Sequence, residues 1–319
     1  MLKYCRLAST IAIWALLAVA LLSLASGRRQ SYRSWSVASS GLGATSSIPH
    51  KIWQIFLTPP KADRASFQIE SSSLAYTASW LARHPNYEYV LVGDEGVEPI
   101  LDQNYKDDEF LHRIFREMKS TGMRSDLLRY VLLATRGGIY ADLDVEAVRP
   151  FDEWVPAEYK DRARVVVGVE FDRLDGPNWN EVHEDMQFAQ WTIAAAPGHP
   201  LLRSMVRRVV STLEAYVEEK GITLAELKAE SADVMVLTGA AAWTDNVLAQ
   251  LQRYEPAITS LRDLSGLKEP RLVGDILILP INGFGMGQSH SGSSNDGTIP
   301  HDAMTRHNFH GSWRNDGSN

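Results

Sequence analysis

The sequence has almost no cysteine: Cys5 carries the single thiol among its 319 residues. No disulfide can form within the chain, so a buried apolar core has to stabilise the fold. Asn-x-Ser/Thr acceptor sequences are also absent, and nothing indicates N-linked glycosylation of the chain itself. No repeat recurs with a period of roughly 20 to 50 residues, which argues against a solenoid.

Clustered positive charge is lacking as well. The 32 Lys and Arg residues are outnumbered by 39 Asp and Glu residues, which gives a net charge of −7 and a pI near 5.7. Proteins that bind nucleic acids need dense Lys and Arg against the phosphates, so the composition argues against such a partner. The content of 45% hydrophobic and 22% charged residues is ordinary for a globular protein.

A single long run without charge is present, at residues 7–25, and basic residues lie close to both of its ends. As a helix rising about 1.5 Å per residue, this run would be roughly 28 Å long, close to the hydrocarbon core of a bilayer. It therefore predicts a transmembrane signal anchor. A cleaved signal peptide is the alternative, because Ser23-Leu24-Ala25 offers small residues at the spacing of a cleavage site. The flanking charges do not decide the orientation.

The anchor divides the chain into four parts. Residues 1–6 form a short tail, and residues 26–47, rich in Ser and Gly, predict a flexible stem. Residues 48–319 alternate predicted strands with predicted helices, which is typical of a single α/β domain.

Hydrophobic patterning places the elements of this domain. Strands are expected at 48–56, 87–92, 139–141, 164–169 and 275–279, and helices at 72–83, 110–118, 125–135, 186–195 and 200–220. The near-continuous apolar run of the fourth strand is typical of a buried parallel strand. Ser125 is the expected cap of the third helix, and the double glycine at residues 137–138 is expected to end it.

Asp142 and Asp144 come at the end of the strand predicted after this helix. On a regular strand two residues at this spacing point to the same face, where two carboxylates repel unless a cation lies between them. Mn²⁺ and Mg²⁺ both prefer oxygen ligands of this kind. The pair is therefore a candidate metal site; a solvated turn is the alternative, because Asp-x-Asp occurs by chance in many proteins.

Several stretches of the sequence resemble glycosyltransferase family 32, whose members share a sugar-binding region with an Asp-x-Asp motif. Within that family the likeness extends to the fungal initiation-specific α-1,6-mannosyltransferases. The matching stretches, in the family's order over most of residues 48–313, are IPHKIWQ, RYVLLATRGGIYADLDVEAVRPFDEW, QFAQWTIAAAPGHPLLR, WTDNVL, GDILILPINGFGMG and HNFHGSW.

The resemblance implies a GT-A fold, a Rossmann-like α/β sheet that binds a nucleotide sugar at the carboxyl ends of its strands. It also implies GDP-mannose as the donor, Mn²⁺ or Mg²⁺ as the cofactor, and transfer with retention of anomeric configuration. Asp126 and Arg129 match the positions that hold the donor's sugar and ribose; a simple i,i+3 surface ion pair is the alternative. Together with Asp144 they are the residues expected to carry catalysis.

Two aromatic residues are expected to bind the donor by the same resemblance, and a third is a candidate by its position before the Asp-x-Asp motif. Trp53 matches the aromatic residue that packs on the nucleotide base, with a core tryptophan as the alternative. Tyr140 is either a wall of the donor site or part of the core. Trp313 lies in the closing segment that folds over the donor phosphates, and such a lid would exclude water.

The sequence departs from the family at the third metal ligand. Relatives have adjacent histidines there, whereas this chain has His307 followed by Asn308, with a further histidine at His310. The expected ligand is His307 or Asn308, with His310 in reserve. Gln187 and Trp191, on the helix predicted for 186–195, are candidates for the acceptor cleft, with core packing as the alternative role of Trp191.

The sequence thus predicts a single-pass type II protein of the Golgi membrane with a luminal catalytic domain. Its expected reaction is α-1,6-mannosyl transfer in the elongation of N-glycan outer chains. Without an evident protein nucleophile, the donor phosphate is expected to help deprotonate the acceptor. Mannosyl transfer to inositol phosphoceramide and a non-catalytic glycan-binding role are the alternatives.

Overall fold

The computed structural model describes residues 47–310 except 60–67, 175, 177–181, 183 and 289–291. The predicted tail, the predicted anchor, nearly all of the predicted stem and Trp313 lie outside the described residues. Within the described part of the chain, no helix combines the length and the apolar character needed to cross a membrane.

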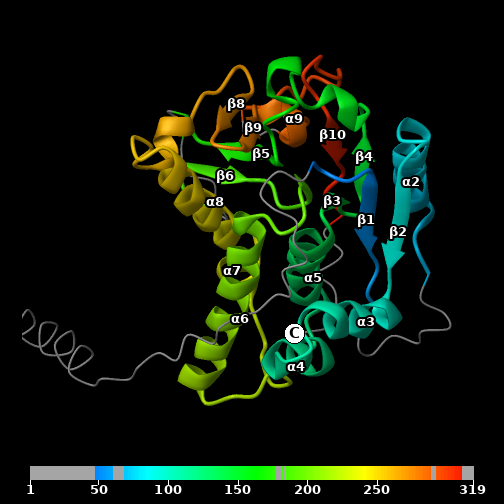
Figure 1. Cartoon of the computed structure of the whole chain (residues 1–319), viewed down its shortest axis with the longest axis vertical. Helices are drawn as coiled ribbons and strands as arrows, with labels where there is room; N and C mark the ends of the chain where they lie inside the picture. The colour runs from blue at the N-terminus through cyan, green and yellow to red at the C-terminus, as the bar shows by residue number, and fades with distance from the viewer. Residues whose placement is uncertain are drawn as a thin grey trace, which may run out of the picture. The chain divides into compact units, whose positions relative to one another are not determined.

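Eight strands of the described residues form one mixed sheet in the order β2-β1-β3-β7-β5-β9-β8, with β6 paired to β5 (Figure 1). The strands are β1 (Lys51–Ile55), β2 (Glu88–Val92), β3 (Gly138–Ala141), β5 (Val165–Asp172), β6 (Met186–Phe188), β7 (Thr192–Ala195), β8 (Arg271–Val273) and β9 (Ile276–Leu279). A separate antiparallel pair joins β4 (Val145–Ala147) to β10 (Thr305–His307). The predicted α/β class is confirmed.

The directions of the strands decide which residues meet at which edge. β1 runs parallel to β2 and β3, and β9 runs parallel to β5. β7 lies between β3 and β5 and is antiparallel to both, so β3 and β5 point the same way. The carboxyl ends of β1, β3, β5 and β9 therefore gather at one edge. The strand predicted at 164–169 is parallel to β9 only, so the prediction of a parallel strand holds on one side.

The helices are α2 (Ser71–Arg83), α3 (Asp94–Asn104), α4 (Glu109–Glu117), α5 (Thr121–Arg136), α6 (Pro200–Lys220), α7 (Ser231–Leu237), α8 (Ala240–Tyr254) and α9 (Ile281–Gly285). α5 starts earlier than predicted because the hydroxyl of Ser120, and not that of Ser125, accepts the cap hydrogen bond from the Met123 amide. Gly137, with φ 64°, ends the helix as predicted, in a conformation that favours glycine.

The helix predicted for residues 186–195 is wrong. This segment forms β6 and β7 with a short turn between them. Every residue of the two strands is buried, so the sequence shows neither a helical nor a two-residue period. Pairing with β5 and β3 determines the conformation, and that information lies elsewhere in the chain.

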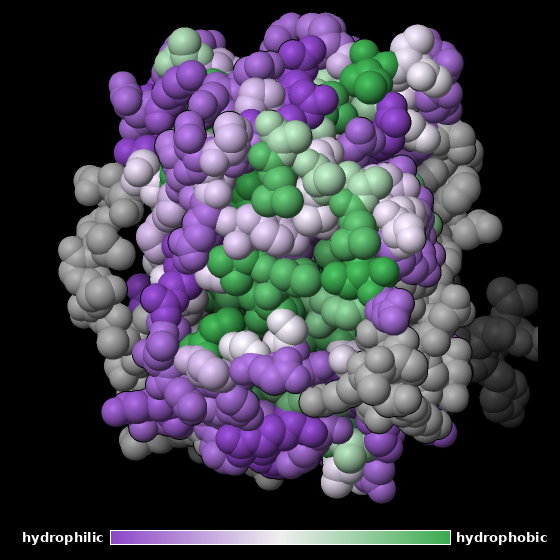
Figure 2. Space-filling view, turned by 90° about the vertical axis from the view of Figure 1, so that its right-hand side faces the viewer, coloured by the Kyte–Doolittle hydropathy of each residue, from purple (hydrophilic) through white to green (hydrophobic). Residues whose placement is uncertain are grey.

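β2 forms an edge of the sheet, and apolar side chains gather in a hollow on the side of the domain that carries it (Figure 2). A cavity of about 580 Å³ borders this strand, and its apolar lining includes Trp53, Val90, Leu91, Val92 and Ile100. The edge strand thus presents apolar side chains, and Trp53 is one of the residues that reach this cavity.

His199 connects the start of α6 to the residue before β9. Its Nδ1 accepts a hydrogen bond from the Leu201 amide at 3.2 Å, and its Nε2 lies 3.1 Å from Oδ1 of Asp275. Burial acts to raise the pKa of Asp275, but hydrogen bonds from His199 and Tyr254 oppose it, and the pKa is held below its usual value. A carboxyl group whose pKa falls on folding stabilises the fold above its unfolded pKa and loses that contribution as the pH drops.

We expect Asp275→Asn to lower the free energy of unfolding at pH 7 by about 1 kcal/mol. Chemical denaturation at pH 7 and again near pH 3 measures the change. Because the variant has no carboxylate to protonate, it should lose less stability than the parent on acidification. An equal loss in both proteins would contradict the role of the His199 contact.

Candidate metal and donor site

Asp142 and Asp144 lie in a tight turn between β3 and β4. The Asp142 amide donates to the Trp191 carbonyl at 2.9 Å, and the Val145 amide donates to the Asp142 carbonyl at 3.1 Å. The strand predicted at 139–141 is confirmed as β3, which ends at Ala141, and the two aspartates follow it in the turn and not on a regular strand. The turn nevertheless brings the two carboxylates together, because each offers an oxygen to one compact cluster.

The third member of this cluster is His307, the last residue of β10. Antiparallel pairing sets His307 opposite Val145, directly after the turn. Its Nε2 lies 3.2 Å from Oδ1 of Asp144, and its ring stacks on Trp191 with 4.4 Å between centroids. Ligand atoms of Asp142, Asp144 and His307 all lie within 4.8 Å of one another.

The electrostatics of the pair are asymmetric. Burial raises the pKa of Asp142; the opposing effect of Arg129 is offset in part by the neighbouring charge of Asp144. Burial acts to raise the pKa of Asp144 too, but hydrogen bonding to His307, the charge of His307 and the His310 amide bring it to about 2. The two partly buried carboxylates thus lie close together, and a cation bound between them would reduce their mutual repulsion.

The donor chemistry of this cluster fits a divalent cation. Two carboxylates and one imidazole suit a metal of intermediate hardness, and all three side chains are at most 27% exposed. Nδ1 of His307 is buried and has no hydrogen-bond partner within the described structure, which leaves the ring held by stacking and by its Nε2 contact. Asp142, Asp144 and His307 are the residues that would hold the metal.

The other two candidates for the third ligand lie beside the cluster. Asn308 donates both its backbone amide, at 3.0 Å, and its side-chain NH₂, at 2.9 Å, to the Asp144 carbonyl. His310 donates its backbone amide to Oδ2 of Asp144 at 3.0 Å, while its ring lies against Glu70 and Tyr76. Both residues therefore fix the position of Asp144 in this structure.

Asp126 and Arg129 are buried, so the alternative of a surface ion pair is wrong. Each is only 5% exposed, and Oδ1 of Asp126 lies 2.8 Å from the Arg129 guanidinium. The guanidinium also lies 3.4 Å from Oδ1 of Asp142 and donates to the Gln190 carbonyl at 3.1 Å. Arg129 therefore brings a positive charge from α5 to the cluster of Asp142, Asp144 and His307.

Tyr140 belongs both to the core and to the site. Its side chain is 1% exposed, its hydroxyl donates to the Asp142 carboxylate, and the Arg129 guanidinium lies 4.8 Å from the centre of its ring. Burial raises the pKa of Tyr140 well above its usual value, so the phenol stays protonated and keeps donating to Asp142.

The sequence reasoning missed three residues that hold the Asp126–Arg129 pair in place. The Thr238 hydroxyl donates to Oδ2 of Asp126 at 2.8 Å. The Tyr130 hydroxyl contacts Oε1 of Gln190 at 2.7 Å and the Thr238 carbonyl at 3.1 Å. These contacts join residues 60 to 112 positions apart, so no local spacing could have revealed them.

The structure places Trp53 away from this cluster. Its indole N–H donates to the Gly137 carbonyl at 2.7 Å, just before β3, whereas Asp142 follows the other end of that strand. Gly137 and Asp142 are five residue steps apart along the strand, which corresponds to about 17 Å. A nucleotide that contacts both would have to extend along β3.

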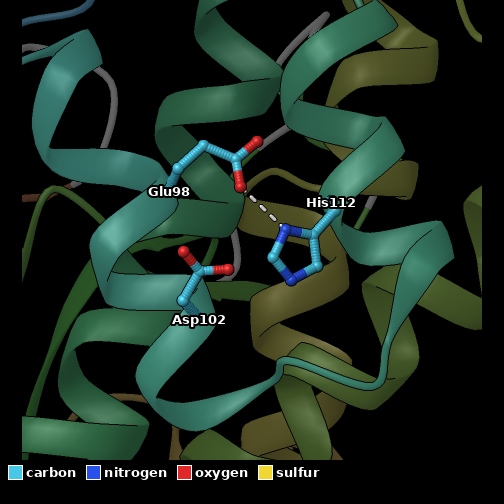
Figure 3. Close-up of side chains that lie close together, drawn as sticks. All are labelled: Glu98, Asp102 and His112. Atoms are coloured by element: carbon cyan, nitrogen blue, oxygen red, sulfur yellow. Dashed lines mark hydrogen bonds and ion pairs between the residues drawn. The ribbon is translucent and has the colours of Figure 1, made fainter.

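A second group of residues suited to metal binding comes from α3 and α4: Glu98, Asp102 and His112 (Figure 3). Nδ1 of His112 lies 2.8 Å from Oε2 of Glu98, and Nε of Arg116 donates to Oε1 of Glu98 at 2.7 Å. Because both oxygens of Glu98 already have partners, this group is an interhelical contact rather than a second candidate metal site.

Residues 71–161 match the sequence model of a family described as "Glycosyltransferase sugar-binding region containing DXD motif". The matched range contains the Asp126–Arg129 pair, Tyr140 and the turn with Asp142 and Asp144. Over this range the chain is similar to the sugar-binding region of that glycosyltransferase family.

Two curated relatives extend the similarity beyond the matched region. The chain is 35% identical to "Initiation-specific alpha-1,6-mannosyltransferase" of Schizosaccharomyces pombe, over 84% of this chain and 64% of that protein. It is 29% identical to the protein of the same name from Candida albicans, over 85% of this chain and 73% of the relative. The chain thus spans somewhat less than two thirds of the length of the first relative.

A solved structure titled "PaToxG Glycosyltransferase" is also similar. It shares 16% sequence identity and a TM-score of 0.41, over 67% of this chain and 73% of that one.

Proposed function

We propose that this chain is a metal-dependent retaining glycosyltransferase that moves mannose from GDP-mannose to a glycan acceptor. The observation that carries the proposal is the cluster of Asp142, Asp144 and His307, with Arg129 bound to Asp142. The names of the relatives support mannose as the transferred sugar and an α-1,6 linkage. The outer chains of N-glycans are the proposed acceptor. Mn²⁺ or Mg²⁺ is the proposed cofactor.

The chain's own residues act mainly by positioning and charge. A bound divalent cation would supply positive charge against the phosphates of the leaving group. Arg129 adds a fixed guanidinium beside Asp142, and Asp126 holds the same Nη2 atom of that guanidinium at 2.8 Å. We propose that the donor phosphate deprotonates the acceptor hydroxyl. The protein then contributes by aligning donor and acceptor and by stabilising the charge that develops.

The proposal extends to the parts of the donor site outside the metal cluster. The Trp53 indole borders the cavity beside β2 and is the proposed surface for the nucleotide base. Trp313, beyond the described residues, is the proposed lid residue over the donor. We also propose that the domain has a GT-A fold, that residues 7–25 form a type II membrane anchor, and that the protein is located in the Golgi.

Turnover with a panel of nucleotide sugars tests the reaction. Purified residues 48–319 are incubated with Mn²⁺, each donor, and either a high-mannose N-glycan or a sphingolipid acceptor. We expect transfer from GDP-mannose to the N-glycan, lost with EDTA and restored by Mn²⁺. Transfer to the sphingolipid alone would show that the acceptor is a lipid and not a glycan. A complete lack of metal-dependent turnover with every donor would contradict the proposed enzyme activity.

A further inference from the structure

Glu170 is a partly buried carboxylate that the proposed mechanism does not use. It lies near the carboxyl end of β5, and β5 points the same way as β3. Glu170 is therefore at the edge of the sheet where Asp142 follows β3. One strand, β7, lies between them, so the two strand ends are about 10 Å apart.

An irregularity in strand pairing gives Glu170 its orientation. β5 pairs with β6 at Val169 and again at Phe171, and the register shifts between these two residues. Glu170 is the extra residue of this β-bulge. Bulges commonly redirect a side chain next to an active site, because the extra residue leaves the regular alternation of the strand.

The surroundings of Glu170 contain an amide but no paired cation. Nε2 of Gln187, on β6, donates to Oε2 of Glu170 at 3.0 Å. No Lys or Arg of the described structure forms an ion pair with this carboxylate. Burial raises the pKa of Glu170 to about 7, although the hydrogen bond from Gln187 and the charge of His307 both act to lower it. Such a carboxyl group does not stabilise the fold, and uncompensated groups of this kind cluster at functional sites.

The position along the sheet indicates which substrate Glu170 meets. Asp142 and Asp144 follow β3, and the cavity lined by Trp53 lies beyond β1, at β2. The proposed nucleotide therefore occupies the side of β3 that faces away from β5. The side toward β5 is left for the sugar that accepts the transfer.

We infer that Glu170, with Gln187 beside it, binds hydroxyl groups of the acceptor sugar. A carboxyl group and a carboxamide together offer both acceptors and donors, which is the set that a sugar ring with several hydroxyls requires. This inference rests on the proposed function, since it needs a glycan acceptor, and it adds the residues that recognise that acceptor.

Glu170→Gln tests the inference, because it keeps the size of the side chain and removes its charge. Acceptor KM and kcat are measured with GDP-mannose and a mannose oligosaccharide, alongside donor hydrolysis without acceptor. We expect kcat/KM for the acceptor to fall by about 10- to 100-fold, mainly through KM, while donor hydrolysis stays within about twofold of the parent.

Asp172→Asn is the matched control on the same strand. Both oxygens of Asp172 have partners within the fold, since Oδ1 accepts from the Ser265 hydroxyl and Oδ2 from the Gly266 amide, each at 2.6 Å. This variant should lower the melting temperature and leave acceptor KM unchanged.

Equilibrium binding of the oligosaccharide, with GDP and Mn²⁺ present, gives a readout independent of turnover. Weaker binding by Glu170→Gln than by the parent supports the inference. If the parent binds the oligosaccharide but shows no transfer, the proposed function is contradicted while the inference about Glu170 stands. Unchanged binding and acceptor KM would overturn the inference. An equal fall in donor hydrolysis would overturn it too, because Glu170 would then act on the donor.

Discussion

Asp144→Asn is expected to lower Mn²⁺-dependent turnover on the order of 100- to 1000-fold. The carboxylate is one of two at the cluster, and its pKa of about 2 keeps it ionised at any physiological pH. Asparagine removes that negative charge, so the affinity for a divalent cation falls together with the charge stabilisation of the leaving group. A metal acting as a Lewis acid contributes several kcal/mol to such a reaction.

The measurement is the initial rate of donor turnover over a titration of Mn²⁺, for the parent and the variant. Partial recovery at high Mn²⁺ would show that metal affinity is the cause. Asp245→Asn is the control, because Asp245 forms an exposed ion pair with Arg208 on the surface of α6 and α8. Both variants remove one carboxylate, so equal activity in the two would contradict the role of Asp144.

Arg129→Met is expected to destabilise the fold by about 3 to 5 kcal/mol and to abolish transfer. Arg129 is the single guanidinium in contact with both Asp126 and Asp142 in the described structure. Removing one partner of a buried ion pair leaves the other charge uncompensated, which explains the size of the loss. Arg129→Lys should recover only part of the activity, because an ammonium cannot span two carboxylates and the Gln190 carbonyl as a planar guanidinium does.

Chemical denaturation gives the change in the free energy of unfolding, and it is compared with that of Arg208→Met. Arg208 is 37% exposed in its pair with Asp245, so its loss should cost less than about 1 kcal/mol. The double variant Asp126→Asn/Arg129→Met should recover part of the stability, because one uncompensated charge is gone. Equal losses for Arg129→Met and Arg208→Met would contradict the structural role of the buried pair.

Local patterns in the sequence predicted most of the architecture. The alternation of apolar runs located β1, β2, β9 and the 21-residue helix α6 to within a few residues. The same patterns placed Asp142 and Asp144 after a short strand, although they did not distinguish a strand from the turn observed there. Local patterns could not predict the order of the strands, because that order depends on pairing between distant segments.

The site was predictable where its residues follow one another and unpredictable where the fold brings them together. Asp126, Arg129 and Asp142 come from one continuous stretch, so spacing and resemblance identified them together. Thr238 and Glu170 reach the site through tertiary packing and a strand bulge, which no local pattern records. His307 was located by its place in the closing segment, and the pairing of β10 with β4 brings it to Asp144.

Binding of Mn²⁺ tests the central claim most directly. Electron paramagnetic resonance of free Mn²⁺ gives the affinity of the parent, His307→Ala and His310→Ala in the presence of GDP. We expect one site in the parent, about 10-fold or more weaker binding for His307→Ala, and little change for His310→Ala, whose ring lies against Glu70. Equal affinity in the parent and His307→Ala would contradict a metal centre formed by Asp142, Asp144 and His307.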